Sequence, residues 1–170
     1  MRNTLLLTAL VVSPFVNAYT DVYTLAGYTS HSVNSVFQTG FNIAMGRDFN
    51  PFLGGDLHLS RTTIGQGHGD GSGSINSFGT DLDIGYQLPL SQASFFKPYA
   101  AIGLERIILS GSNAVDMGRS KKMSLRYGVG FRATADNGLG VKVLYVINRS
   151  LKSSVSLKNT QLDMSFVYHF

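Results

Sequence analysis

The chain has 170 residues and a formal net charge of +4, with 44% hydrophobic and only 14% charged residues. This length fits one domain. Cysteine is absent, so a secreted chain of this size has no disulfide framework and must depend on a closed sheet or a large core. The basic residues are dispersed and accompany no nucleic-acid-binding motif, so the charge does not indicate a nucleic-acid partner.

The first 18 residues predict a secretory signal peptide. Arg2 precedes the apolar run 5–12, and a small-residue cleavage site ends at Ala18. The apolar run is too short to cross a bilayer as a helix, which needs roughly 20 residues. We therefore expect export through the secretory pathway, removal of residues 1–18 as signal peptide, and a single domain over residues 19–170.

The rest of the chain is divided by turn-forming residues into about eight segments of alternating apolar and polar side chains. No other apolar stretch approaches the length of a spanning helix, so a membrane protein must here cross with strands. Short connections alternate with longer ones, as in outer-membrane barrels. The pattern predicts an all-β fold, an eight-stranded antiparallel up-and-down transmembrane β-barrel. Its expected strands are 20–30, 36–48, 53–63, 77–88, 96–109, 121–134, 139–149 and 160–170.

The alternation also predicts which side chains face lipid. The segment 121–134 is among the clearest, with large apolar residues at odd positions and Ser, Gly or Arg at even positions from Met123 to Arg132. A soluble barrel follows the same period with an apolar interior, but it would have to bury many charged side chains in that interior, which is very costly. The charges therefore favour a membrane barrel with a polar lumen. The register of the first segment, 20–30, is ambiguous.

The charged side chains assigned to the lumen form the main candidate site. An eight-stranded barrel is just wide enough for its side chains to fill it, so we expect these groups to interlock as a structural plug. The alternative is a gated passage for protons or small ions. Glycines on the inward register would leave room for the long cations. The predicted lumen network consists of Asp56, His58, Asp81, Asp83, Glu105, Arg126, Arg132, Lys142 and Asp163.

Two weaker patterns are candidates for a metal site and a catalytic site. The glycine-rich segment 64–76 contains His68 and Asp70, but one Asp without a repeat favours a flexible loop over a calcium site. His58 and Ser60 share a strand face, and Glu105 would complete a hydrolase set, yet such a spacing is common by chance. We therefore predict no catalytic residues, no cofactor and no metal.

The last segment carries a specific resemblance. Five apolar residues alternate with polar ones, except that Val167 stands at a polar position, and the segment ends on an aromatic residue. This pattern resembles the closing strand of outer-membrane β-barrels, which in that family is read by the barrel assembly machinery. The resemblance implies that the assembly signal is Leu162, Met164, Phe166, Tyr168 and Phe170. The whole of residues 19–170 resembles the small eight-stranded barrels of the OmpX/Ail, OmpA transmembrane-domain and Opa types.

This resemblance implies a monomer in the outer membrane of a Gram-negative bacterium, in contact with lipid and lipopolysaccharide. It further implies a non-enzymatic structural or surface-interaction protein, of the adhesion or virulence type, whose extracellular loops meet host surface ligands. The alternatives are a narrow or gated pore and, less favoured, a lipid A-modifying hydrolase, since lipid A deacylases are also small barrels. Cations expected at the level of lipopolysaccharide phosphates are Arg119, Lys121, Lys122, Arg149, Lys152 and Lys158.

Overall fold

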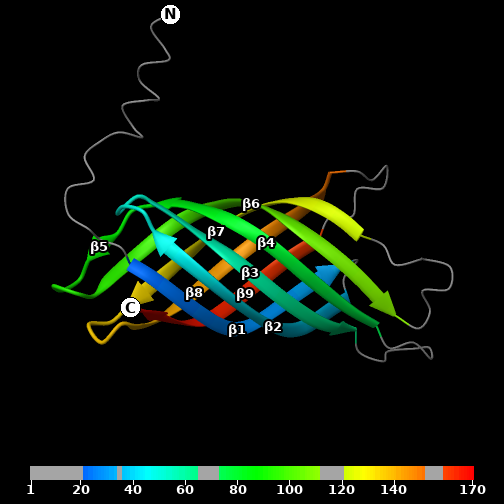
Figure 1. The fold of residues 1–170 in the computed structure, drawn as a ribbon, viewed down its shortest axis with the longest axis horizontal. Coiled ribbons are helices and arrows are strands. Elements are labelled where there is room, and N and C mark those ends of the chain that lie inside the picture. The colour runs from blue at the N-terminus through cyan, green and yellow to red at the C-terminus, as the bar shows by residue number, and fades with distance from the viewer. Residues whose placement is uncertain (1–20, 34–35, 65–72, 112–120, 152–158) are drawn as a thin grey trace, which may run out of the picture.

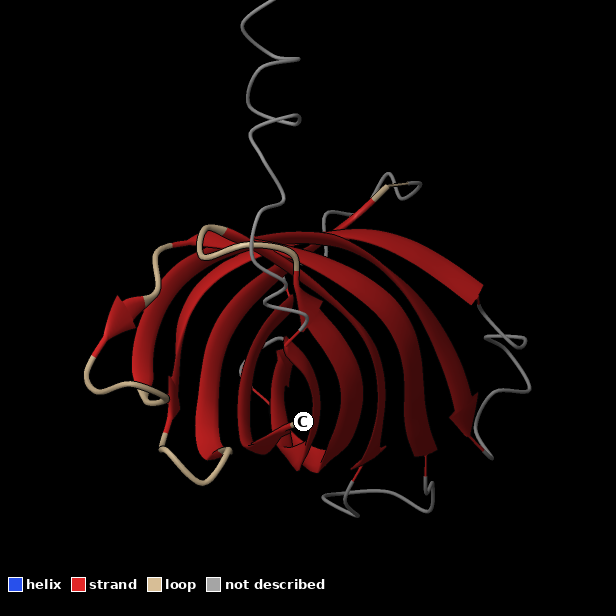
Figure 2. Ribbon diagram, turned by 60° about the vertical axis from the view of Figure 1, so that its left-hand side comes forward, coloured by secondary structure: helices blue, strands red, loops and turns tan. Residues whose placement is uncertain are grey.

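In the computed structural model the chain forms one antiparallel sheet that closes on itself (Figures 1 and 2). The structure describes residues 21–33, 36–64, 73–111, 121–151 and 159–170, so the predicted signal peptide lies outside the described residues. No helix in this described part is long and apolar enough to cross a membrane.

Eight long strands build the wall of the barrel. Each pairs with its neighbours in the chain, and pairing of the first strand with the last closes the sheet. A two-residue strand, β5, pairs only with the first residues of β6. Because β4 pairs with β6 directly, β5 is not one of the strands that close the wall. This confirms the predicted eight-stranded antiparallel barrel. The strands are β1 (Asp21–Val33), β2 (Val36–Asp48), β3 (Leu53–Ile64), β4 (Gly73–Gly85), β5 (Leu88–Pro89), β6 (Phe95–Gly111), β7 (Lys121–Thr134), β8 (Leu139–Ser150) and β9 (Asn159–His169).

The two ends of the barrel differ in their connections. The turn end carries the connections 49–52, 86–94 and 135–138, and the carboxy-terminus lies there (Figure 1). The opposite end, the loop end, is where β1 to β2, β3 to β4, β6 to β7 and β8 to β9 are joined. This arrangement agrees with the predicted alternation of turns and loops.

One strand boundary differs clearly from the prediction. Strand β4 begins at Gly73 and ends at Gly85, whereas the sequence pattern placed it at 77–88. The residues before Ser77 are Gly, Ser, Ile and Asn, which resemble a loop in composition. Their backbone nevertheless continues the ladder with β3 on one side and β6 on the other. Backbone pairing does not depend on side-chain polarity, so composition misplaced this edge.

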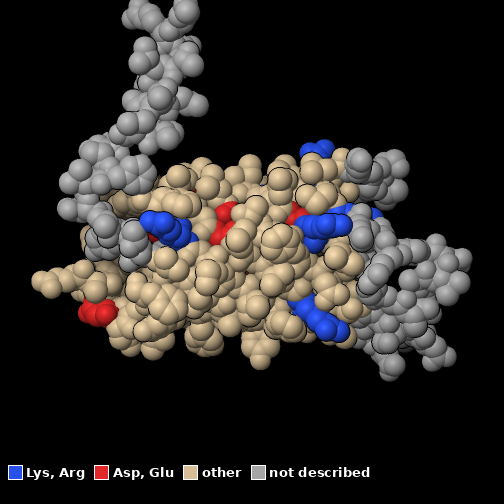
Figure 3. Space-filling view, in the orientation of Figure 1, with Lys and Arg blue, Asp and Glu red and all other residues tan. Residues whose placement is uncertain are grey.

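The outer surface carries a broad apolar belt. Large side chains such as Phe41, Leu57, Val129 and Phe166 point away from the barrel and are exposed. Most of the visible face in Figure 3 is uncharged, and its Lys and Arg side chains lie towards the two ends. Contiguous apolar surface of this extent is untypical of a soluble monomer and matches the lipid-facing band of a spanning barrel.

The structure settles the register of β1. Tyr23, Leu25, Thr29 and His31 point into the lumen, and all are buried. The inward face of this strand thus begins with two large apolar residues and ends with two polar ones. The outer face of β1 does not stand out as apolar, because its exposed Tyr28 combines an aromatic ring with a polar hydroxyl. Hydrophobicity therefore does not distinguish the two faces of this strand. This mixture explains why the sequence left the strand ambiguous.

Candidate functional site

The lumen is filled by polar side chains from all eight long strands. The structure places all nine predicted network residues on the inner wall, and none is more than 7% exposed. Together with Asp48 and Lys97, which are also buried, they form two groups that we name by their position. The turn-end cluster is Asp48, Asp83, Lys97 and Arg132. The central cluster is Asp56, His58, Asp81, Glu105, Arg126, Lys142 and Asp163.

The turn-end cluster is a compact set of paired charges. Lys97 Nζ donates to Asp48 Oδ1 at 2.6 Å and to Asp83 Oδ2 at 3.3 Å. Arg132 donates to the second oxygen of Asp48. The Arg132 guanidinium also lies 4.1 Å from the ring centroid of Tyr23, a cation–π contact. Two carboxylates therefore face two permanent cations.

Asp48 and Lys97 were missing from the predicted network. Both were within reach of the alternation argument, because even-numbered residues of β2 and odd-numbered residues of β6 face inward. Counting back by twos from Glu105 leads to Lys97. Each lies at the end of its strand, where the neighbouring turn obscured the period.

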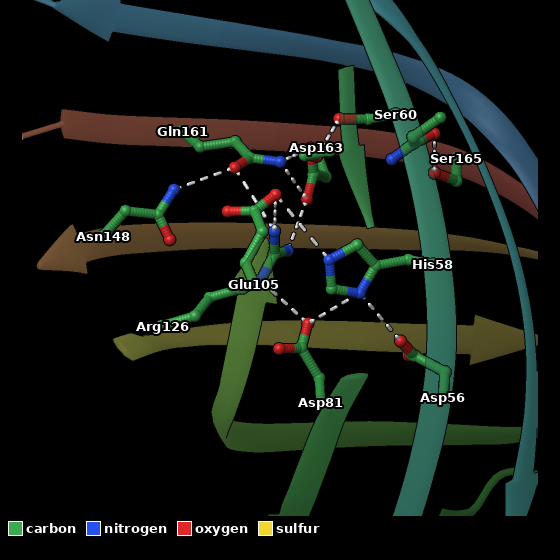
Figure 4. A network of polar contacts seen from close by, with 12 residues as sticks. Asp56, His58, Ser60, Asp81, Glu105, Arg126, Asn148, Gln161, Asp163 and Ser165 are labelled. Atoms are coloured by element: carbon green, nitrogen blue, oxygen red, sulfur yellow. Dashed lines mark hydrogen bonds and ion pairs between the residues drawn. The ribbon is translucent and has the colours of Figure 1, made fainter. Parts of the chain in front are cut away.

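Arg126 is the centre of the second group (Figure 4). Its Nε donates to Asp81 Oδ2 at 3.0 Å, and its Nη2 donates to Asp163 Oδ2 at 2.9 Å. Its Nη1 lies 3.5 Å from Glu105 Oε1. One guanidinium from β7 thus ties together carboxylates from β4, β6 and β9. The planar guanidinium group suits such multiple contacts because its N–H donors are fixed in a fork-shaped arrangement.

Neutral amides extend this group towards the loop end. Gln161 accepts from Arg126 Nη1 at 3.3 Å and donates to Asp163 Oδ1 at 2.8 Å. Asn148 donates to Gln161 Oε1 at 3.1 Å. Sequence reasoning did not include either amide, since it selected charged residues. On the other side, Lys142 pairs with Asp56.

His58 occupies an unusual position among three carboxylates. Its Nδ1 lies 3.6 Å from Asp56 Oδ1 and 3.7 Å from Asp81 Oδ2, and its Nε2 lies 3.8 Å from Glu105 Oε1. Within the described residues, neither ring nitrogen has a hydrogen-bond partner. Gly79, the partner of His58 in the β3–β4 ladder, makes room for the ring, since a Cβ there would lie 2.5 Å from Nε2.

The central cluster leaves little free space. A cavity of about 20 Å³ lies beside it, lined by Asp56, His58, Asp81, Arg126 and Lys142 among others. A single water molecule needs roughly 10–15 Å³, so the cavity has room for about one water or ion. At this level, the described side chains close the lumen.

The pair His58 and Ser60, from which the sequence analysis predicted no catalysis, does not face lipid. Ser60 and His58 both point into the lumen, and Ser60 Oγ lies 2.7 Å from Ser77 Oγ. His31 is likewise buried in the lumen, and His169 lies on the inward register of β9. In the described residues, every histidine therefore lies on the inward register.

Exposed cations lie near the loop end. Arg149 is exposed at the end of β8, Lys122 is half-buried at the start of β7, and Lys121 is the first residue of β7. The predicted cations Arg119, Lys152 and Lys158 lie outside the described residues. Arg61 and Arg106 are exposed on the outer face of β3 and β6, and the sequence analysis did not single them out.

The predicted assembly signal lies on one face of the barrel. Leu162, Met164, Phe166 and Tyr168 all point outward from β9, and Phe170 follows the strand with an exposed side chain. Phe166 is 76% exposed. The backbone N–H of Phe170 donates to Val22 O, which attaches the end of the chain to β1.

Comparison with known proteins gives one family and several solved structures of the same fold. The model of the outer membrane protein beta-barrel domain matches residues 4–170. No curated protein matches the sequence. Among solved structures, Ail, the attachment invasion locus protein of Yersinia pestis, is 15% identical with a TM-score of 0.56, covering 89% of this chain and 99% of that chain. A second structure of Ail holds the heparin analogue sucrose octasulfate.

Two further structures share the fold. The N-terminal beta-barrel domain of Pseudomonas aeruginosa OprF is 13% identical with a TM-score of 0.57, covering 89% of this chain and 98% of that chain. The outer membrane enzyme PagL is 15% identical with a TM-score of 0.55, covering 85% of this chain and 98% of that chain. At these identities the likeness concerns the fold, which carries both enzymes and non-enzymes.

Proposed function

The chain belongs to the family of outer membrane protein β-barrel domains and is a bacterial outer-membrane protein; from this premise we propose that it is a non-enzymatic, monomeric scaffold that presents its loop end for surface interaction. The observation that carries this proposal is the Arg126 network, which joins β4, β6, β7 and β9 across the lumen. A barrel tied together in its middle is rigid. Rigid scaffolds with variable loops are a common basis for recognition.

The charges at the loop end suggest an acidic ligand. Arg61, Arg106 and Arg149 are exposed on the outer face near that end. At this level they suit the phosphates of lipopolysaccharide, and an acidic polysaccharide at the cell surface has the same chemistry. Ail, a protein of the same fold, has been solved with a sulfated sugar, which supports an acidic glycan as the class of ligand.

A pore is the alternative function. Conduction would require Arg126 to separate from Asp81, Glu105 and Asp163, which would leave buried charges unpaired. We therefore expect no steady conductance in planar bilayers. Regular single-channel steps from folded wild-type protein would favour the pore.

A lipid A hydrolase is the less favoured alternative. Its substrate lies in the membrane, whereas His58 and Ser60 are enclosed by the barrel wall. Overexpression should leave the lipid A mass spectrum unchanged. A new deacylated species that disappears in Ser60→Ala would overturn the non-enzymatic assignment.

Attachment provides the direct test. A non-adherent Gram-negative strain producing the protein should bind a heparin-coated surface, and replacing 65–72 and 112–120 with short Gly-Ser connections should weaken this binding. The matched control replaces the turn 135–138 at the opposite end. Surface amounts and heat-modifiable gel mobility must be equal in all strains. Equal attachment by the loop variants, or none by the wild type, would reject the surface-interaction proposal.

A further inference from the structure

The charges of the central cluster do not balance. Four carboxylates, from Asp56, Asp81, Glu105 and Asp163, face only two permanent cations, Arg126 and Lys142. Among the described residues, no other Lys or Arg lies within 4.0 Å of these carboxylates. A buried excess of negative charge is very unfavourable unless a cation compensates it or one of the groups takes up a proton. The lumen therefore requires additional positive charge at this point.

His58 lies where that positive charge is needed. Its side chain extends from β3 past Gly79 of β4, and its Nδ1 points towards Asp56 and Asp81 (Figure 4). These 3.6 and 3.7 Å separations are too long for hydrogen bonds. Two ligands of one tetrahedral zinc ion are roughly 3.4 Å apart, given bonds of about 2.0–2.2 Å. A small contraction would thus bring all three groups onto one ion.

The existing partners of the three groups are compatible with metal binding. Asp81 Oδ2 accepts from Arg126 Nε at 3.0 Å, and a carboxylate oxygen has a second lone pair for a metal ion. Lys142 pairs with Oδ2 of Asp56 and leaves Oδ1, the oxygen that faces His58. Glu105 lies opposite the other ring nitrogen of His58, 3.8 Å away. Histidines that bind metal through one nitrogen usually donate the other N–H to a carboxylate or carbonyl, which orients the ring. Glu105 is in place for this role.

We propose that the lumen binds one divalent cation of the zinc type between His58 Nδ1, Asp56 Oδ1 and Asp81 Oδ2. One possible ligand atom from each of the three residues lies within 4.8 Å of the other two. The adjoining cavity of about 20 Å³ offers the space for a water as fourth ligand. With His58 neutral, two positive charges from the metal cancel the excess of the cluster. The site ties β3 to β4 through the ion and is independent of what the loop end binds.

Metal retention is the direct experiment. Wild-type protein is unfolded with a chelator, refolded in detergent with Zn²⁺, dialysed, and analysed for bound zinc by mass spectrometry. We expect one zinc per folded barrel. Refolding with Co²⁺ should give visible absorption from cobalt ligated by nitrogen and oxygen, a readout that needs no variant. No retained zinc together with no cobalt spectrum would overturn the proposal and leave protons as the compensating charge.

Matched variants separate ligation from simple charge attraction. His58→Gln and Asp81→Asn should lose zinc, whereas His31→Gln, which alters another buried lumen histidine, should retain it. Asp163→Asn removes the same charge as Asp81→Asn but no proposed ligand, so it should weaken binding less. Glu105→Gln should reduce affinity by roughly 10–100-fold, as expected for a residue that orients a ligand. Folding of each variant is checked by heat-modifiable gel mobility.

The pattern across the variants decides the outcome. Equal losses in Asp163→Asn and Asp81→Asn would show non-specific attraction to an acidic lumen, and full retention in His58→Gln would exclude the histidine. Either result overturns the site. If His58→Gln does not fold, Asp81→Asn and the cobalt spectrum of the wild type still give the answer.

Discussion

The turn-end cluster and the central cluster differ in how their buried charges are balanced. Both fill the lumen with charged side chains, and both are buried. The turn-end cluster sets two carboxylates against two permanent cations, whereas the central cluster sets four carboxylates against two. The first is balanced in formal charge and is adequately explained as a structural feature. The second needs a further cation, which is why it is the better candidate for chemistry.

The largest expected effect comes from removing the cation of the central cluster that has the most partners. Arg126→Met should lower the free energy of unfolding by about 3–5 kcal/mol, because carboxylates on three strands lose their buried partner. Denaturant titration in detergent, followed by circular dichroism, measures the change. Arg106→Met, on the exposed outer face, is the control and should change stability by less than about 0.5 kcal/mol. Equal losses in both variants would contradict a central role for Arg126.

The next effect tests the difference in charge balance. In the presence of a chelator, Asp48→Asn should lower the free energy of unfolding by about 1.5–3 kcal/mol, because Lys97 and Arg132 lose a charged acceptor. Asp163→Asn should cost less than about 1 kcal/mol, because it relieves part of the negative excess while Arg126 keeps other partners. The same titration compares them. A larger loss for Asp163→Asn would mean that the central cluster is balanced by groups other than a metal.

A smaller effect concerns the space around His58. Gly79→Ala should lower the free energy of unfolding by about 1–2 kcal/mol, since the added Cβ would lie 2.5 Å from His58 Nε2 and 2.7 Å from Leu104 O. Gly55→Ala is the control on the same pair of strands, where the nearest atom is Asp81 O at 3.2 Å. Thermal unfolding of the two variants gives the comparison. Equal melting temperatures would show that His58 can move away without loss.

The smallest effect on stability belongs to the loop end. Arg149→Gln should change the free energy of unfolding by less than about 0.5 kcal/mol, because the side chain is exposed. Combined with Arg61→Gln and Arg106→Gln, it should nevertheless reduce attachment to a heparin-coated surface. Arg47→Gln, an exposed residue at the turn end, is the matched control. Unchanged attachment in the triple variant would restrict recognition to the connecting loops.

Much of the barrel could be predicted from the period of two alone. The clean segments gave correct faces, as in β7, where Arg126 and Arg132 point inward and Val129 points outward. The predicted start of β4 was wrong because Ser and Asn before residue 77 resemble a loop in composition, whereas the backbone there pairs with strands on both sides.

The role of the last strand in assembly stays a prediction. Phe170→Ala tests it, with delayed appearance of the heat-modifiable form as the expected result.

By itself, the sequence determined the class of fold and most of the charged residues inside, because alternation along a strand assigns each side chain to one of two faces; it missed Asp48 and Lys97. Only the tertiary structure decided which of these charges meet, since partners such as Lys142 and Asp56 are 86 residues apart in the chain and their contact depends on strand register and barrel closure. The same closure brings His58 between carboxylates from β3, β4 and β6 and divides the lumen into one balanced and one unbalanced cluster.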